Sequence, residues 1–452
     1  MVASMSTPRL DRPTAGRSKV LAWALWDCGS TGMNAIVATF VFSVYLTGSV
    51  GQGLPGDASP ASWLGRTLTI AGLVVAVLAP VTGVLVQAPH RRRTALTVLT
   101  ALAALSTSAM CFIRDDVAYL VPGLALLALT AACGDLASVP YNAMLRQLTT
   151  PQNSGKVSGL GWAAGYIGSV VLLLVLYFGF IAGDGPARGL LGIPVDDGQN
   201  IRMAMLMTAA WFVVFAMPLL FTAHTFAPAA EPQSQPTGVL SGYRQLWGDL
   251  KVEWKRDRNL VYYLLVSAVF RDGLAGVFAF GAVLGVSGYG ISQAGVLIFG
   301  MIASTLAAVG AIVGGHFDDR IGGKPVIVAS LSALIVVCAG LMAVHGPVAF
   351  WICGLLLALF VGPTQSAART LLLRMAGESK EGVAFGLYTM TGRAVAFLAP
   401  WLFFVFVDWF HADRAGLGGL IVVLAAGLIG LLFVRIPHAR VGAEGKPAEG
   451  NP

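Results

Sequence analysis

Residues 20–45 read VLAWALWDCGSTGMNAIVATFVFSVY, an apolar run that contains a single carboxylic acid, Asp27. A helix needs roughly 20 residues to cross a bilayer, so this run is long enough to be a membrane span. A carboxylate in the middle of a span costs on the order of 2.5–3.5 kcal/mol even on a lenient insertion scale. We therefore expect Asp27 to face a bundle interior or a water-filled cavity and to have a function there.

The whole chain has the composition of an integral membrane protein. Of its 452 residues, 56% are hydrophobic and only 11% are charged, and the mean hydropathy is +0.76. Hydropathy predicts about twelve spans, of which the eleventh is expected at Gly382 to Val407. The five cysteines lie in or beside apolar runs without metal-ligand spacing, so we expect no disulfides and no metal site. No phosphate-binding loop or nucleophile motif occurs in the sequence, and we expect neither enzymatic activity nor a cofactor.

Basic residues are unevenly distributed across the predicted membrane. Most of the 29 lysines and arginines fall in the two tails and in the loops on the same side as the tails. By the positive-inside rule this side is the cytoplasm, so the sequence predicts a multi-pass protein of the cell membrane with both termini cytoplasmic. The net charge of +7 then reflects membrane topology and predicts no nucleic-acid partner.

The second half of the chain repeats landmarks of the first half. Asp27 in the first span corresponds to Asp272 in the seventh, and Arg146 corresponds to Arg374. The predicted divisions are a cytoplasmic tail (1–19), a six-helix bundle (20–223), a cytoplasmic linker with an amphipathic helix (224–259), a second six-helix bundle (260–436) and a second cytoplasmic tail (437–452).

The segment Gly315-His-Phe-Asp-Asp-Arg-Ile-Gly-Gly-Lys324 resembles the Gly-x-x-x-Asp-Arg-x-Gly-x-Arg/Lys signature of the major facilitator superfamily. Asp319 can sit at a helix end and pair across to a neighbouring span while Arg320 and Lys324 hold the cytoplasmic gate, so that the cluster breaks and reforms as the halves rock. An ordinary basic turn is the alternative. The resemblance implies an all-α membrane protein with two pseudo-symmetric six-helix halves. The expected gating residues are Gln87, Arg91, Arg92, Asp319, Arg320 and Lys324, with Gln87 standing where the first-half copy should have its acid.

Three further blocks, residues 23–27, 157–166 and 385–393, resemble the vacuole-effluxer-like, autophagy-related branch of that superfamily. Fungal members of this branch are implicated in releasing amino acids from the vacuole. The resemblance implies efflux of a small organic solute and does not identify it.

Charged residues inside the predicted spans suggest where such a solute would bind. Repeat-built transporters bind substrate near the bilayer midplane between their halves. An ammonium group could meet Asp27 or Asp135 in the first half. A carboxylate could be held by Arg393 or Arg271 in the second half, because the planar guanidinium suits bidentate contact. Arg393 has no acid within one turn and Gly392 leaves room beside it, so its partner is either a substrate or a permanent acid, Asp27 or Asp135.

The candidate substrate-binding residues are Asp27, Asn34, Tyr141, Arg271, Gln365, Tyr388 and Arg393, and the candidate proton-coupling residues are Asp27, Asp135 and Asp272. Structural ion pairs and helix-to-helix hydrogen bonds are the alternative roles for these side chains. We expect a monomeric secondary transporter that works by alternating access in contact with membrane lipid, is coupled to protons, and exports amino acids or similar small solutes. The alternatives are a transporter of lipid-like or drug-like amphiphiles and a non-transporting receptor or scaffold.

Overall fold

The computed structural model describes residues 16–55, 59–226, 258–377 and 380–435, with the isolated residues 244 and 248. Apart from Arg244 and Gly248, the predicted amphipathic helix lies outside the described residues, as do most of the linker, residues 1–15 and the whole C-terminal tail.

Twelve helical segments of the described chain are long and apolar enough to cross a membrane, which confirms the predicted number. The helices before residue 227 are α1 (Arg17–Asn34), α2 (Phe42–Tyr45), α3 (Pro60–Leu85), α4 (Pro89–Ala109), α5 (Leu120–Ala143), α6 (Leu145–Leu148), α7 (Ser154–Leu176) and α8 (Gln199–Thr222). The helices after residue 257 are α10 (Asn259–Ser287), α11 (Gln293–Ile321), α12 (Gly323–Ala343), α13 (Pro347–Met375), α14 (Glu381–Val395), α15 (Leu398–Phe410) and α16 (Gly416–Phe433). A short antiparallel pair, β1 (Ala187–Arg188) with β2 (Ile193–Pro194), lies in the loop before α8.

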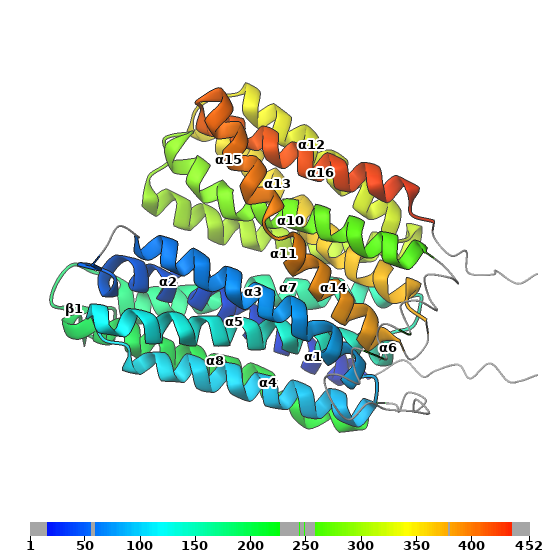
Figure 1. The fold of residues 1–452 in the computed structure, drawn as a ribbon, viewed down its shortest axis with the longest axis horizontal. Helices are drawn as coiled ribbons and strands as arrows, with labels where there is room; N and C mark the ends of the chain where they lie inside the picture. The colour runs from blue at the N-terminus through cyan, green and yellow to red at the C-terminus, as the bar shows by residue number, and fades with distance from the viewer. Residues whose placement is uncertain are drawn as a thin grey trace, which may run out of the picture.

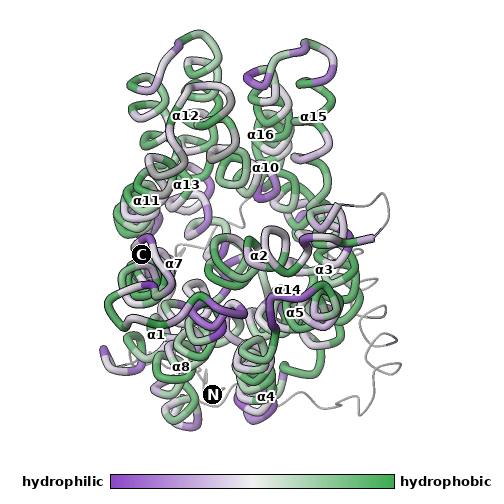
Figure 2. Tube along the Cα trace, turned by 90° about the vertical axis from the view of Figure 1, so that its left-hand side faces the viewer, coloured by the Kyte–Doolittle hydropathy of each residue, from purple (hydrophilic) through white to green (hydrophobic). Residues whose placement is uncertain are grey.

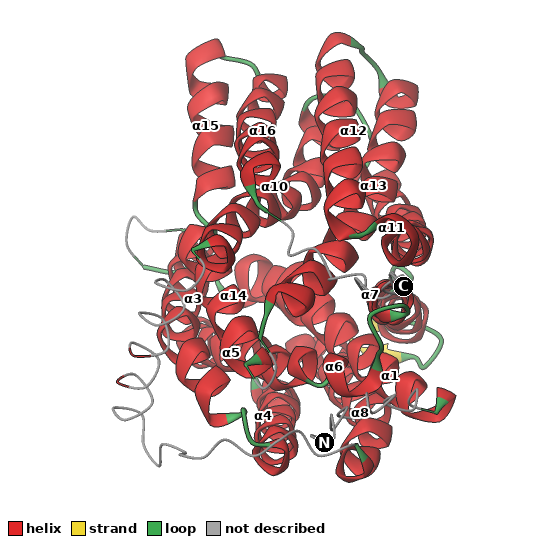
Figure 3. Cartoon of the chain, turned by 90° about the vertical axis from the view of Figure 1, so that its right-hand side faces the viewer, coloured by secondary structure: helices red, strands yellow, loops and turns green. Residues whose placement is uncertain are grey.

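Both described ends of the chain lie on one side of the molecule, which we call the terminal side (Figures 1 and 3). Lys19, at the start of the first span, donates to the carbonyl of Thr225 at the end of the sixth, with an N–O distance of 2.7 Å. The backbone N–H of Arg435 donates to the side chain of Asn259 at 2.8 Å, which joins the end of the twelfth span to the start of the seventh. Each half of the chain therefore begins and ends on the terminal side.

Large apolar side chains cover much of the outer surface. Val348, Val336 and Phe112 are exposed by 72%, 69% and 70% of their surface. Figure 2 shows hydrophobic residues along most of the helical trace. A soluble protein rarely exposes an apolar surface this extensive, whereas the hydrocarbon of a bilayer accepts it without cost.

The two halves approach each other most closely near the terminal side. There α3 packs against α14 and α7 packs against α11, and glycines allow backbone contact. A Cβ atom added to Gly83 would lie 2.4 Å from the carbonyl oxygen of Gly382. One added to Gly155 would lie 2.4 Å from that of Gly315. Toward the opposite side the two bundles diverge (Figure 1).

Two spans are less regular than hydropathy suggests. The first runs from Arg17 to Val50 and contains π-helical segments at Ala35–Phe40 and Leu46–Val50. The eleventh is broken between α14 and α15, at residues 396–397. Pro400 has no N–H to donate to the carbonyl one turn earlier, which favours a break at this point.

Candidate functional site

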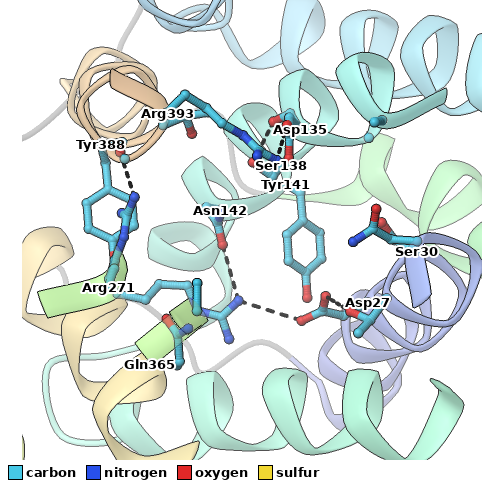
Figure 4. Close-up of a pocket in the computed structure, with 18 of the residues that line it drawn as sticks. Asp27, Ser30, Asp135, Ser138, Tyr141, Asn142, Arg271, Gln365, Tyr388 and Arg393 are labelled. Carbon is cyan, nitrogen blue, oxygen red and sulfur yellow. Dashed lines mark hydrogen bonds and ion pairs between the residues drawn. The ribbon is translucent and has the colours of Figure 1, made fainter. Parts of the chain in front are cut away.

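A cavity of about 420 Å³ lies between the two halves. Its lining comes from α1, α5 and α7 on one side and from α10, α13 and α14 on the other. The structure brings together at this cavity every residue predicted from the sequence to bind substrate or couple protons, namely Asp27, Asn34, Asp135, Tyr141, Arg271, Asp272, Gln365, Tyr388 and Arg393. Figure 4 shows most of these side chains.

Asp27 lies at the edge of the cavity and faces the second half. One turn later on α1, the hydroxyl of Thr31 donates to Oδ1 at 3.2 Å. Oδ2 is 3.8 Å from Nη1 of Arg369, and the side chains of Arg369 and Asp27 are only 5% and 14% exposed. The hydroxyl of Tyr141 points toward the same carboxylate (Figure 4). The low exposure means that this ion pair is weakly screened by water.

Arg369 is a second-half residue whose side chain is held by the first half. Its Nη2 donates to the backbone carbonyl of Ser158 at 2.6 Å, and its Nε donates to the hydroxyl of that serine at 3.0 Å. Its Nη1 donates to the side-chain oxygen of Asn142 at 3.2 Å. The guanidinium also lies 4.9 Å from the ring centre of Trp23 and 5.6 Å from that of Trp162. These contacts would have to separate if the two halves moved apart here.

A second ion pair crosses the cavity. Arg393 on α14 pairs with Asp135 on α5. The side chains are 41% and 27% exposed, so this pair is more open to the cavity than that of Asp27. Of the two partners expected for Arg393, substrate or acid, the structure shows the acid. The room beside Gly392 is taken by another residue, because a Cβ atom there would lie 1.8 Å from Nη2 of Arg271.

Arg271 and Asp272 are consecutive on α10 and make different contacts. Nη2 of Arg271 donates to the carbonyl of Tyr388 at 3.0 Å, and the guanidinium carbon lies 3.5 Å from the centre of that ring. Asp272 accepts a hydrogen bond from the backbone N–H of Ala399 at 2.6 Å. That N–H belongs to the first turn of α15, so Asp272 caps the outer part of the broken span.

The neutral candidate residues differ in how deeply their side chains are buried and in how much they contact neighbouring residues. Tyr141 is 2% exposed, and its ring stacks on Trp23 and Trp26 with centre distances of 4.6 and 4.4 Å. Asn34 ends α1 and is exposed. Gln365, on α13, is half-buried at the cavity wall.

On the terminal side, Glu381 of the second half forms ion pairs with two arginines of the first half. Nη2 of Arg92 lies 3.2 Å from Oε2, and Nε of Arg146 lies 2.6 Å from Oε1. Arg92 is 1% exposed and also donates to the carbonyl of Val86 at 2.7 Å. This cluster closes the terminal side between α3 and α14.

A second cluster closes that side between α7 and α11. Asp319 accepts hydrogen bonds from the backbone N–H groups of Gly155 at 2.7 Å and Lys156 at 3.0 Å, so a second-half acid caps a first-half helix. Arg374 pairs with the neighbouring Asp318 and donates to the hydroxyl of Ser154 at 2.9 Å. An acid at a helix N-terminus is favourable, because the helix dipole and the free N–H groups both attract it.

The other predicted gating residues are placed differently. Gln87 is buried beside the Glu381 cluster, and its carbonyl accepts from Arg92 at 3.4 Å. Arg91 is half-buried, whereas Arg320 is exposed. Lys324 donates to the carbonyls of residues 432 and 434, at 2.9 and 2.8 Å, so these bonds lie within the second half and do not join the halves.

Sequence reasoning missed Arg369, Glu381 and Arg374 as functional residues. Arg369 carries a charge inside a span, which is a usable signal, but its position near the membrane edge made it less prominent. The repeat supplies a signal for the others, because Arg374 corresponds to Arg146, and the match of Gly386 with Gly159 makes Glu381 correspond to Ser154. Each arginine contacts the start of the opposite half's helix, α7 or α14.

Comparison with known proteins agrees with this fold. Residues 28–444 match the protein family described as "Vacuole effluxer Atg22 like". The chain is 22% identical over 413 residues to the MFS-type transporter YxiO of Bacillus subtilis, covering 91% of this chain and 94% of that protein. It is 22% identical over 326 residues to autophagy-related protein 22 of Yarrowia lipolytica, covering 64% of this chain and 52% of that protein.

Solved structures with the same fold include two symporters. The proton:xylose symporter XylE superimposes with a TM-score of 0.70 at 14% identity, covering 92% of this chain and 94% of that one. The transporter FucP, in an outward conformation, gives 0.67 at 12% identity, covering 93% and 100%. The chain therefore belongs to the vacuole effluxer Atg22-like family and is a multi-pass membrane transporter of the major facilitator superfamily.

Proposed function

We propose that this protein is a proton-coupled secondary transporter that works by alternating access and exports amino acids or similar small organic solutes. The cavity lies between the halves, and clusters around Glu381 and Asp319 close it on the terminal side. A transporter of this kind must open one side while the other is closed. The family description as an effluxer supports export.

The observation that carries the proposal is that two acids of the first half pair across the cavity with two arginines of the second half. These pairs are Asp27 with Arg369 and Asp135 with Arg393. A proton that binds either carboxylate removes the attraction to its arginine, so proton binding would change how strongly the halves are held together. Asp135 is the more exposed of the two acids and is therefore our candidate for proton loading.

The orientation in the membrane also belongs to the proposal. Most of the basic residues in the described part of the chain lie at the helix ends and loops of the terminal side, and the positive-inside rule assigns this side to the cytoplasm of a cell membrane. In that orientation the structure is closed to the cytoplasm. The halves diverge toward the outside (Figure 1).

The test is uptake of a ¹⁴C-labelled L-amino-acid mixture into proteoliposomes. Asp135→Asn should abolish accumulation driven by a proton gradient and leave exchange of internal for external solute measurable, because only the proton step is lost. Asp184→Asn makes the same change in an exposed loop on the opposite side and should behave as the parent. Unchanged accumulation in Asp135→Asn refutes the assignment to Asp135.

The same assay separates the alternative functions. A receptor or scaffold would move no solute under any gradient. The amphiphile alternative predicts that Asp27 and Arg393 satisfy each other, whereas each has a different partner in this structure. The charged lining on both halves favours a polar solute.

A further inference from the structure

Arg271 is the one cavity arginine that has no acidic partner among the described residues. Arg369 pairs with Asp27, and Arg393 pairs with Asp135. Asp272, the neighbour of Arg271, is occupied by the N–H of Ala399. Arginine is always charged in proteins, so Arg271 brings an uncompensated positive charge into the wall of a membrane cavity.

The hydrogen bonds of Arg271 are also incomplete. Nη2 donates to the carbonyl of Tyr388, but Nη1 is buried and has no hydrogen-bond partner within the described part of the chain. A buried donor without a partner is costly, and such a group needs a reason to be retained. The ring of Tyr388, 3.5 Å from the guanidinium carbon, holds the charge in place without neutralising it.

We infer that the transported solute carries a carboxylate and that Arg271, not Arg393, is the residue that binds it. This inference rests on the proposed function, whose amino-acid solutes carry a carboxylate, and identifies the residue that binds this group. A carboxylate supplies both the negative charge and the acceptor that Nη1 lacks, in the planar geometry that a guanidinium favours. Without solute, the guanidinium lies against the ring of Tyr388. When the solute enters, the guanidinium rotates away from the ring to contact the carboxylate.

Gly392 fits this role because it makes room for the guanidinium. A Cβ atom at this position would lie 1.8 Å from Nη2 and 3.1 Å from the guanidinium carbon of Arg271. The three atoms nearest to such a Cβ atom all belong to that flexible side chain, so Gly392→Ala should displace the guanidinium of Arg271.

The test is ligand-induced thermal stabilisation of the purified protein in detergent. The probes are small α-amino acids, the 2-hydroxy acids of the same carbon skeletons, and the methyl esters of both. In the parent, an acid should bind at least about tenfold more tightly than its ester, because hydrogen bonds between charged groups are lost in the ester. Arg271→Lys keeps the positive charge but loses the planar pair of N–H donors of the guanidinium. This variant should lose most of the preference for acid over ester, while its affinity for the ester stays unchanged.

Two further variants keep the result interpretable. Arg414 donates to the carbonyl of Gly288 and lies 4.6 Å from the ring centre of Tyr289, an arrangement like that of Arg271 but not in the cavity lining. Arg414→Lys should therefore keep the acid preference of the parent. Should Arg271→Lys fail to fold, Gly392→Ala must show the same loss of preference.

The inference is overturned if esters bind the parent as tightly as acids, if no acid stabilises it, or if both cavity variants keep the acid preference. Flux into proteoliposomes separates this failure from failure of the proposed function. Transport of esters or other solutes without a carboxylate, unaffected by Arg271→Lys, removes only the carboxylate site. Acids that bind but are never moved by any gradient count against transport itself.

Discussion

Replacing Arg369 with glutamine should shift the protein toward a state that is open on the terminal side. The guanidinium reaches from α13 into the first half, where it donates three hydrogen bonds to Ser158 and Asn142 and lies 3.8 Å from Asp27. All of these contacts join the two halves. A shorter, neutral amide cannot reproduce them together.

The size of the shift follows from the number of bonds. Hydrogen bonds to a charged group contribute about 1.5–3 kcal/mol each, and part of this returns when water reaches the freed groups. Taking about 3 kcal/mol for the whole set, at about 1.4 kcal/mol per tenfold, the ratio of closed to open protein falls roughly 100-fold. A population about 99% closed on the terminal side would become about equally divided.

Distances between spin labels measure this shift. Labels at the exposed residues Gln152 and Ile321 report on the terminal side, and labels at Gln52 and His411 report on the opposite side. In Arg369→Gln the distance between the terminal-side labels should lengthen in about half of the molecules, and the distance between the labels on the opposite side should shorten in the same fraction. Arg414→Gln, which removes bonds within one half, is the control. Parent-like distributions in Arg369→Gln would refute the role of this residue in holding the halves together.

Two other predictions concern the contacts around the closed side and the broken span. Gly155→Ala places a Cβ atom 2.4 Å from a backbone oxygen of the other half and should lengthen the distance between the terminal-side labels. Gly65→Ala is the control, because a Cβ atom there has nothing within 4 Å and should leave this distance unchanged. Equal distance distributions in the two variants would contradict the role of close glycine packing. Asp272→Ala removes the acceptor for the N–H of Ala399 and should lower the free energy of unfolding in mixed micelles by about 1 kcal/mol, whereas Asp272→Asn keeps a side-chain oxygen and most of the stability. Equal stability of both Asp272 variants would show that the cap contributes nothing.

The sequence predicted the spans and the cavity residues better than their pairing. Asp27 and Arg393 could be identified because a charge within an apolar run is costly wherever it points. The sequence offered Asp27 and Asp135 as possible acids for Arg393 but could not choose between them, because the residues of each pair come from different halves and only the packing of the helices determines which of them meet. The structure pairs Arg393 with Asp135 and leaves Arg271 without an acid, a distinction that charge counting cannot make.

Residues at the membrane edge were harder to recognise. Glu381 follows a lysine at the start of a span. Charged residues are common at this depth because water or headgroups can solvate them, so the sequence does not single Glu381 out. The ion pairs of Glu381 with Arg92 and Arg146 depend on how closely α3 approaches α14. Hydropathy does not reveal the break in the eleventh span, because it stays high through residues 396–397 while the hydrogen-bond pattern changes; the sequence signal for a bend is Pro400.

In the proposed mechanism, solute and proton movements are coupled through one cavity. This coupling is tested most directly by recording proton flux and flux of the labelled amino-acid mixture in the same proteoliposomes, with a lumenal pH dye and no imposed pH gradient. A solute gradient alone should then drive proton movement in the parent, and this proton movement should be lost in Asp135→Asn while solute exchange continues. Solute flux without any proton movement in the parent would contradict the account.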